Sequence, residues 1–170
     1  MSDLGQKFMQ TNKSVIKYQN DEIYRFYNIR ECGNFKLRFS FIATNSKRRQ
    51  AIVICFNKCQ GKYSVNGDFF NKIPKGTFAN IGFWEDTAPQ SFEIEFCTCS
   101  DKLILCNGSD LIGDKSICRM QYENCAMKIE KVSQNKMRFF CNDYDSNNFD
   151  DLIFEMEIIK GQNLPAKLGA

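Results

Sequence analysis

The chain has 170 residues, of which 43% are apolar and 25% are charged, with a formal net charge of +3. These totals are typical of one ordinary globular domain, so they exclude intrinsic disorder and a membrane-embedded protein. The charge is small and dispersed, so it does not indicate a nucleic-acid partner. The absence of histidine excludes Ser-His, Cys-His and His-metal mechanisms. We therefore predict that the chain is not an enzyme and has no catalytic residues and no cofactor.

Residues 1–14 carry polar side chains throughout, without the apolar run of a signal peptide, and no stretch of about eighteen apolar residues occurs. Nine cysteines, an odd number, lie mostly inside apolar stretches, where Cys behaves as a small buried hydrophobe. We therefore expect reduced thiols, a cytoplasmic or nuclear location and no membrane contact. The organisation expected is a flexible segment 1–12, one domain over 13–160 and a loose tail 161–170.

Taken in chain order, the predicted elements are nearly all strands. Only Asp3–Met9 would accommodate a short helix. The clearest strand is 34–42, where Phe35, Leu37, Phe39 and Phe41 alternate with polar residues, a period that places one face on a core. The other predicted strands are 14–18, 23–28, 51–56, 62–66, 78–84, 102–106 and 126–131, with alternating segments at Phe92–Phe96, Met137–Cys141 and Leu152–Ile158.

About eleven short strands separated by turn residues predict an all-β fold, an antiparallel two-sheet sandwich with little or no helix. Asn66-Gly67 and Asn107-Gly108 are the residue pairs typical of tight turns, and Asn107-Gly108 could close a hairpin. No linker divides the chain into halves.

A series of motifs runs from Asn34 to Leu111. They are Ala51–Asn57, Tyr63–Gly67, Phe83-Trp84-Glu85, Ser91–Phe96 and Lys102–Gly108. In order and spacing they resemble the galectin family of β-galactoside-binding sandwiches, which implies a galectin-like or jelly-roll-like fold. The resemblance implies ligand binding by Asn57, Asn66, Trp84 and Glu85, with the indole stacked on a sugar. The family's sugar-binding His and Arg are replaced by Cys55 and Cys59.

Three functions follow as alternatives. The first is a non-enzymatic, galectin-like binding module that acts in protein-protein interaction as a subunit of an intracellular assembly. The second is a carbohydrate-binding lectin that uses the Trp84 region. The third is an OB-like protein that binds single-stranded nucleic acid through Tyr24, Arg25, Phe26 and Tyr27. An edge strand at Ile23–Tyr27 could also form a homo-oligomer.

Two patterns bear on metal binding. Structural zinc sites typically have two residues between neighbouring Cys ligands. The pairs Cys55–Cys59 and Cys97–Cys99 lack this spacing. The Asp- and Asn-rich run 142–151 resembles the start of a calcium loop, but it has Asn148 and Phe154 where an EF-hand needs Gly and Glu. We predict no metal site and leave calcium at 142–151 as an open question.

Overall fold

The computed structural model describes residues 3–31, 33–57, 62–66, 68–70, 78–99, 103–110, 126–143 and 148–161. Within these ranges the chain forms one short helix and a series of strands. Their bounds are α1 (Asp3–Thr11), β1 (Val15–Tyr18), β2 (Asp21–Tyr24), β3 (Tyr27–Ile29), β4 (Gly33–Thr44), β5 (Gln50–Asn57), β6 (Lys62–Val65), β7 (Asp68–Phe70), β8 (Phe78–Trp84), β9 (Ser91–Cys99), β10 (Leu103–Ser109), β11 (Ala126–Lys131), β12 (Lys136–Asn142) and β13 (Leu152–Lys160).

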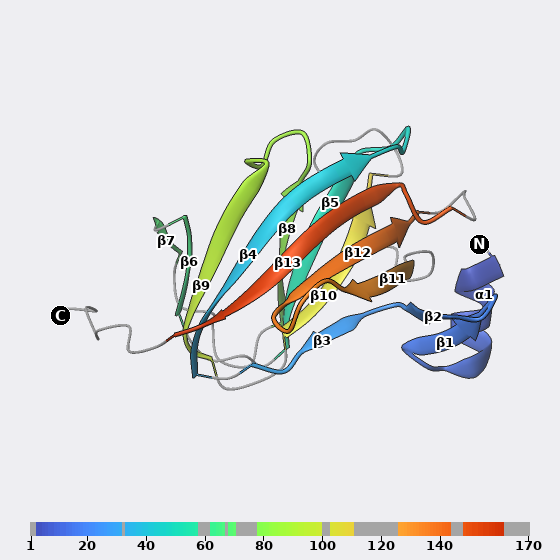
Figure 1. Ribbon diagram of the computed structural model, residues 1–170, viewed down its shortest axis with the longest axis horizontal. Coiled ribbons are helices and arrows are strands. Elements are labelled where there is room, and N and C mark those ends of the chain that lie inside the picture. Colours follow the sequence, from blue (N-terminus) through green and yellow to red (C-terminus); the bar gives the residue numbers. More distant parts are fainter. Residues whose placement is uncertain are drawn as a thin grey trace.

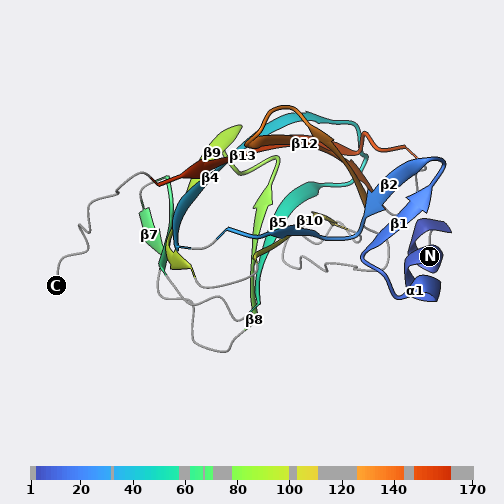
Figure 2. The same ribbon diagram turned by 60° about the horizontal axis from the view of Figure 1, so that its bottom comes forward.

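The strands form two antiparallel sheets that pack face to face (Figure 1). The larger sheet has the order β1-β2-β11-β12-β13-β4-β9-β6-β7, and the smaller sheet has the order β3-β10-β5-β8. In Figure 2 the larger sheet arches over the smaller one, with α1 beside the β1–β2 hairpin at one end. The predicted all-β, two-sheet sandwich is therefore confirmed.

The alternation of apolar and polar residues explains the packing of the larger sheet. Phe35 and Phe39 on β4 are buried, and their direct partners on β9 are Phe96 and Phe92. These cross-strand rings stack, with centroids 5.0 Å apart for Phe35–Phe96 and 5.2 Å apart for Phe39–Phe92. Such aromatic pairs stabilise a sheet beyond the area that they bury. The strongest period-two signal in the sequence thus marks the centre of the larger sheet.

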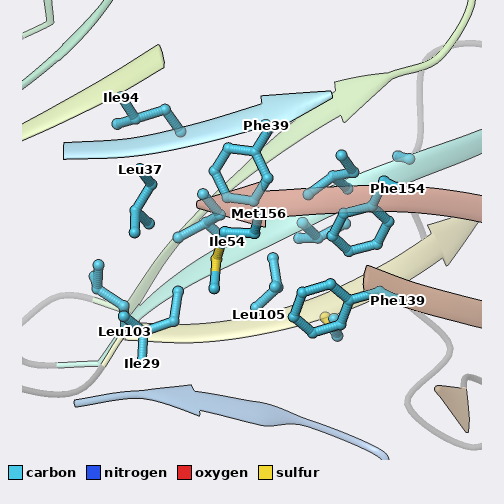
Figure 3. Packing of buried hydrophobic residues seen from close by; sticks show 14 of the residues in the cluster. Ile29, Leu37, Phe39, Ile54, Ile94, Leu103, Leu105, Phe139, Phe154 and Met156 are labelled. Carbon is cyan, nitrogen blue, oxygen red and sulfur yellow. The ribbon is translucent and has the colours of Figure 1, made fainter. Parts of the chain in front are cut away.

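The smaller sheet supplies the opposite wall of the core. Ile54, Leu103 and Leu105 are fully buried and point toward the aromatic face of the larger sheet (Figure 3). One ring crosses between the sheets: Phe83 on β8 stacks on Phe92 with centroids 4.3 Å apart. β5 and β10 lie in the middle of this sheet, so their side chains are buried on both faces, as expected for a central strand with a continuous apolar run.

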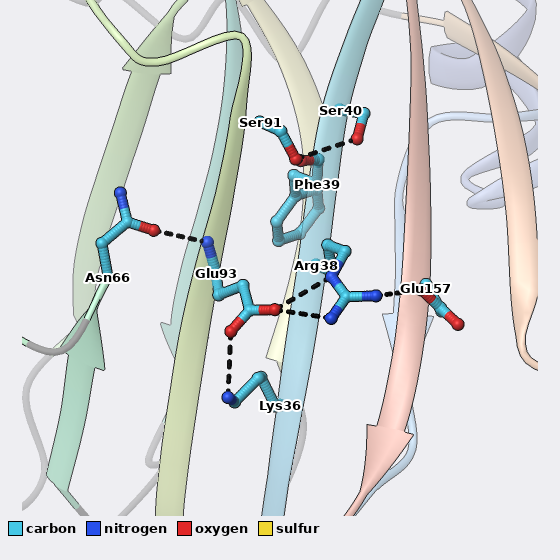
Figure 4. Close-up of polar contacts among 8 residues, drawn as sticks. All are labelled: Lys36, Arg38, Phe39, Ser40, Asn66, Ser91, Glu93 and Glu157. Atoms are coloured by element: carbon cyan, nitrogen blue, oxygen red, sulfur yellow. Dashed lines mark hydrogen bonds and ion pairs between the residues drawn. The ribbon is translucent and has the colours of Figure 1, made fainter.

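The outer face of the larger sheet is covered by ion pairs rather than by apolar side chains (Figure 4). Glu93 on β9 accepts from Lys36 at 2.9 Å and from Arg38 on β4 at 2.9 Å, and Arg38 also reaches Glu157 on β13. On the next strands Lys136 and Arg138 both contact Glu155. The cations of this face are thus neutralised by carboxylates one strand away.

The N-terminal segment 1–12, expected to be flexible, contains α1. Leu4 and Phe8 lie one turn apart and are 1% and 2% exposed, because they pack in a second cluster with Ile16, Ile23 and Ala126. Asn12 follows the helix with φ of 51°, a left-handed conformation that Asn tolerates at a helix C-terminus. No helix in the described part of the chain is long and apolar enough to cross a membrane.

Two local predictions are corrected by the pairing. The segment 23–28, predicted as one strand, changes sheets: β2 lies in the larger sheet and β3 in the smaller one, because Phe26-Tyr27 breaks the alternation. Asn107-Gly108 is not a turn but lies inside β10, opposite Ile52 and Ala51 of β5. The backbone bonds of the neighbouring strand outweigh the local turn preference of these two residues.

Two other local predictions concern turns and the C-terminus. Asn66-Gly67 does connect two strands, since Val65 of β6 pairs with Asp68 of β7. Most of the expected tail lies outside the described residues.

The Glu155 ion pairs predict a measurable contribution to stability. Only 10% of the Glu155 side chain is exposed, so Glu155→Gln should lower the free energy of unfolding by about 1 to 2 kcal/mol at neutral pH. Lys136 and Arg138 hold the pKa of Glu155 below its usual 4.5. The stabilisation is therefore complete above that value and is lost as the pH falls through the folded-state pKa. Urea unfolding at neutral and acidic pH measures both effects.

Glu157→Gln is the matched control, because Glu157 lies on the same strand but its side chain is 37% exposed. We expect this change to cost less than about 0.5 kcal/mol. An equal loss of stability in the two variants would contradict the assignment of this role to Glu155.

Candidate functional site

The four residues expected to surround a sugar lie in three different places. Trp84 ends β8 and Glu85 follows it, opposite the start of β5. Asn57 ends β5 and pairs with Phe78, at the far end of the same two strands; its side chain lies outside the described part. Asn66 follows β6 in the other sheet. The structure thus brings Trp84 and Glu85 together, and it separates both from Asn57 and Asn66.

The Trp84 corner is held together by contacts within the chain. The Arg49 guanidinium lies over the indole, 4.5 Å from the ring centroid, and its Nη2 is 2.6 Å from Asp86 Oδ1. The Glu85 carboxylate accepts a hydrogen bond of 2.6 Å from the backbone N–H of Gln50, and burial raises the pKa of Glu85 above its usual 4.5. One face of the indole, the surface needed for stacking on a sugar, is therefore covered by Arg49.

Asn66 has a local role in its hairpin. Its φ of 50° places it in the left-handed region, which Asn adopts more readily than most residues. The Asn66 side-chain Oδ1 accepts a hydrogen bond from the Glu93 backbone N–H at 2.8 Å (Figure 4). The Asn66 backbone N–H donates to the Glu93 backbone carbonyl. The amide that would contact a ligand is thus used to attach β6 to β9.

A hollow of about 430 Å³ opens on the flank of the sandwich where β2 leads into β3. Its volume is within the range of pockets that hold small ligands or a few side chains. Tyr24, Phe26, Tyr27 and Ile158 form the apolar part of its wall. The polar part consists of Ser14, Asn28, Arg30 and Glu31. Tyr24, Phe26 and Tyr27 are three of the residues singled out for nucleic-acid stacking, and the structure does bring them together.

The aromatic surface of the hollow carries two phenol groups, which lie beside the charged Arg30 and Glu31. The hydrogen bond to Glu22 raises the pKa of Tyr24, and burial raises the pKa of Tyr27, so both phenols remain protonated. Tyr27 also packs edge-on against Phe139 of the core, with centroids 5.5 Å apart. Tyr27 thus connects the wall of the hollow to the core.

Sequence reasoning could not identify the whole hollow. Asn28 lies within β3 and Arg30 and Glu31 follow it, whereas Ile158 comes from β13, far away in the sequence. The available signal was the break in alternation at Phe26-Tyr27, which leaves aromatic side chains that a single strand cannot all bury.

The metal-ligating side chains of the described residues do not form a cluster of their own. Within them, no group of three or more His, Cys, Asp or Glu side chains is arranged to hold a metal ion. Cys55, Cys106 and Cys141 are buried in the core as thiols, in agreement with the expected role of Cys as a small hydrophobe. Three of the Cys side chains considered for zinc, those of Cys59, Cys97 and Cys99, lie outside the described part. Asp145 and Asn147, from the Asp- and Asn-rich run 142–151, also lie outside it.

The Arg49–Trp84 contact leads to a fluorescence prediction. Trp84 is the chain's only tryptophan. Arg49→Ala removes the cation over the indole and should shift the emission to longer wavelength, with a lower midpoint of urea unfolding. Urea unfolding followed by tryptophan emission measures both. Arg25→Ala, which removes a guanidinium lying over Phe26 instead, is the control and should leave the emission unchanged. An unshifted emission in Arg49→Ala would show that the cation does not cover the ring.

Comparison with protein-family models, with curated proteins and with solved structures finds no match for this chain. The galectin resemblance of its middle segment is therefore a hypothesis that depends on the quoted motifs alone, and the function must be argued from the contacts of the chain itself.

Proposed function

We propose that this chain is a non-enzymatic binding module that acts in protein-protein interaction, as a subunit of an intracellular assembly. The observation that supports the proposal is the flank hollow, where Tyr24, Phe26 and Tyr27 surround an open volume at the margin of a closed core. Exposed aromatic surface beside a few polar groups is typical of the anchoring pockets of protein interfaces.

The strand beside the hollow favours an extended peptide as the bound element. β3 is an edge strand: among the described residues it pairs only with β10. Asn28, in the middle of β3, is exposed and also lines the hollow. A partner strand added to this edge could bond to the backbone while one of its side chains enters the hollow. Of the edge strand predicted at Ile23–Tyr27, only Tyr27 lies on an edge strand. Ile23 and Tyr24 belong to β2, which lies between β1 and β11.

The charges of the larger sheet favour a protein partner over nucleic acid. Lys36, Arg38, Lys136 and Arg138 are all paired with carboxylates on the outer face. Nucleic-acid affinity comes largely from cations that neutralise phosphates, and a face of paired charges supplies few of them. Beside the hollow, Arg30 is accompanied by Glu31.

The test is a matched pair of substitutions in the two edge strands of the smaller sheet. Asn28→Arg places a long charged side chain at the hollow, and Asn80→Arg makes the same change at an exposed position on β8, the opposite edge. The tagged full chain and both variants are used to purify partners from extract of the source cells. Asn28→Arg should reduce a stoichiometric protein partner at least tenfold, a loss of about 1.4 kcal/mol in binding free energy, while Asn80→Arg retains it.

Three results would overturn the proposal. The first is equal retention of the partner by both variants, which would place the interface elsewhere. The second is bound glycoprotein that lactose elutes, which would favour the lectin alternative and a working site at Trp84. The third is bound nucleic acid whose recovery falls steeply with salt, which would favour the OB-like alternative.

A further inference from the structure

The buried polar residues of the chain gather at one end of the sandwich. Among the side chains that the structure describes, all the buried polar ones except Ser64 and Glu155 lie where β5 begins, β10 ends, β12 ends and β13 begins. We call this group the polar end cluster. Its members are Gln50, Asn107, Ser109, Asp110, Asn142, Asp143 and Asp151.

Two amides of the smaller sheet reach across the interior in this cluster. Gln50 is opposite Ser109 and Asn107 is opposite Ile52, so the two amides are diagonal neighbours on the same face. Gln50 Nε2 donates to Asp143 Oδ2 at 2.8 Å, and Asn107 Nδ2 donates to the Asn142 carbonyl at 3.0 Å. These acceptors fix the orientation of both amides, because a rotated amide would place oxygen against oxygen.

Because the side-chain nitrogens of Gln50 and Asn107 bind these acceptors, their side-chain oxygens must find donors elsewhere. Gln50 is 0% exposed and Asn107 is 1% exposed, and neither Gln50 Oε1 nor Asn107 Oδ1 has a donor among the described residues. Buried acceptors normally have a partner, because burial removes their hydration. Two such oxygens on neighbouring strands therefore point to a bound species that supplies positive charge or donors.

Buried carboxylates lie at the same place, beside the half-buried Arg48, whose carbonyl also accepts from Gln50 Nε2 at 3.3 Å. The carboxylates of Asp143 and Asp151 are buried, and Asp151 Oδ2 accepts from the Asp143 backbone N–H at 2.8 Å. Asp143 Oδ2 also accepts from Ser46 at 2.6 Å. The Gln50 amide thus contacts a buried carboxylate directly, and the Asn107 amide contacts the backbone of the residue before Asp143.

We propose that the polar end cluster binds a calcium ion through Gln50 Oε1, Asn107 Oδ1 and a carboxylate oxygen of Asp143. Calcium accepts six to eight oxygen ligands in irregular geometry and takes amide and carboxylate oxygens together. Magnesium requires a near-octahedral shell, and zinc prefers nitrogen and sulfur ligands. Because no three carboxylates of the described chain converge, the two amide oxygens are necessary parts of the site.

Trp84 supplies a direct readout for this proposal. It is opposite Ala51, the residue next to Gln50, so Trp84 is a near neighbour of the cluster across the thickness of the smaller sheet. Terbium, which takes the same oxygen ligands as calcium, emits when a nearby tryptophan transfers its excitation energy. After treatment with EDTA, the full chain should bind one terbium ion with Trp84-sensitised emission, and calcium should displace it. Calcium about a hundredfold above its Kd should also raise the Tm by about 5 °C.

Substitutions separate the proposed ligands from the surrounding acidic residues. Asn107→Leu and Gln50→Leu remove one oxygen ligand each, and Asp143→Asn keeps the shape but removes a charge; each should reduce terbium emission at least tenfold. Asp150→Asn is the matched control: Asp150 belongs to the same acidic run but contacts Asn45 at the surface, so emission should be unchanged.

The wild-type chain alone can overturn the proposal, even if a variant does not fold. No sensitised terbium emission, together with a Tm unchanged by millimolar calcium, would mean that internal water satisfies the two oxygens. Emission retained in both Gln50→Leu and Asn107→Leu would place any bound ion outside the cluster. An equal rise in Tm with magnesium would contradict the selectivity for calcium.

Discussion

Phe92 joins the two sheets of this protein. Its ring stacks on Phe39 of the same sheet and on Phe83 of the opposite sheet, and it is 1% exposed. Protein interiors are packed as densely as organic crystals, so a ring held on both faces fixes the separation of the layers. Because this separation is constant, the inward-facing apolar residues of β4, β9 and β13 are buried against the smaller sheet. The edges and ends of the sandwich are then left open to other roles.

The positions of the polar and charged side chains follow the two-layer arrangement of the sheets. Charges on the outer face of the larger sheet are paired across strands, and the middle of the interior is apolar. Unusual groups appear only at the margins: aromatic side chains around the flank hollow, and amide and carboxylate oxygens in the polar end cluster. Natural proteins depart from simple packing rules mainly where they bind something. The two margins are therefore the places where a ligand or partner is proposed.

Local patterns in the sequence predicted the strands well but not how they combine. The alternating segments 34–42 and Leu152–Ile158 lie within β4 and β13, because period-two alternation is a property of each segment alone. The order of strands depends on pairs far apart in sequence, such as β13 with β4. The sugar-binding prediction depended on local motifs, and the strand order separates Asn66 from Trp84. The hollow could not be predicted for the same reason, since Ile158 and Tyr27 meet only after folding.

The position of β13 has a consequence for biosynthesis. It is the last strand of the described chain, yet it lies between β12 and β4 and pairs with both along most of its length. While a ribosome extends the chain, β4 and β12 have no partner on these sides until β13 emerges, so the larger sheet cannot close stepwise from its N-terminal end. Nascent chains that stop short of β13 would expose two long apolar strand edges, which is the kind of surface that chaperones bind.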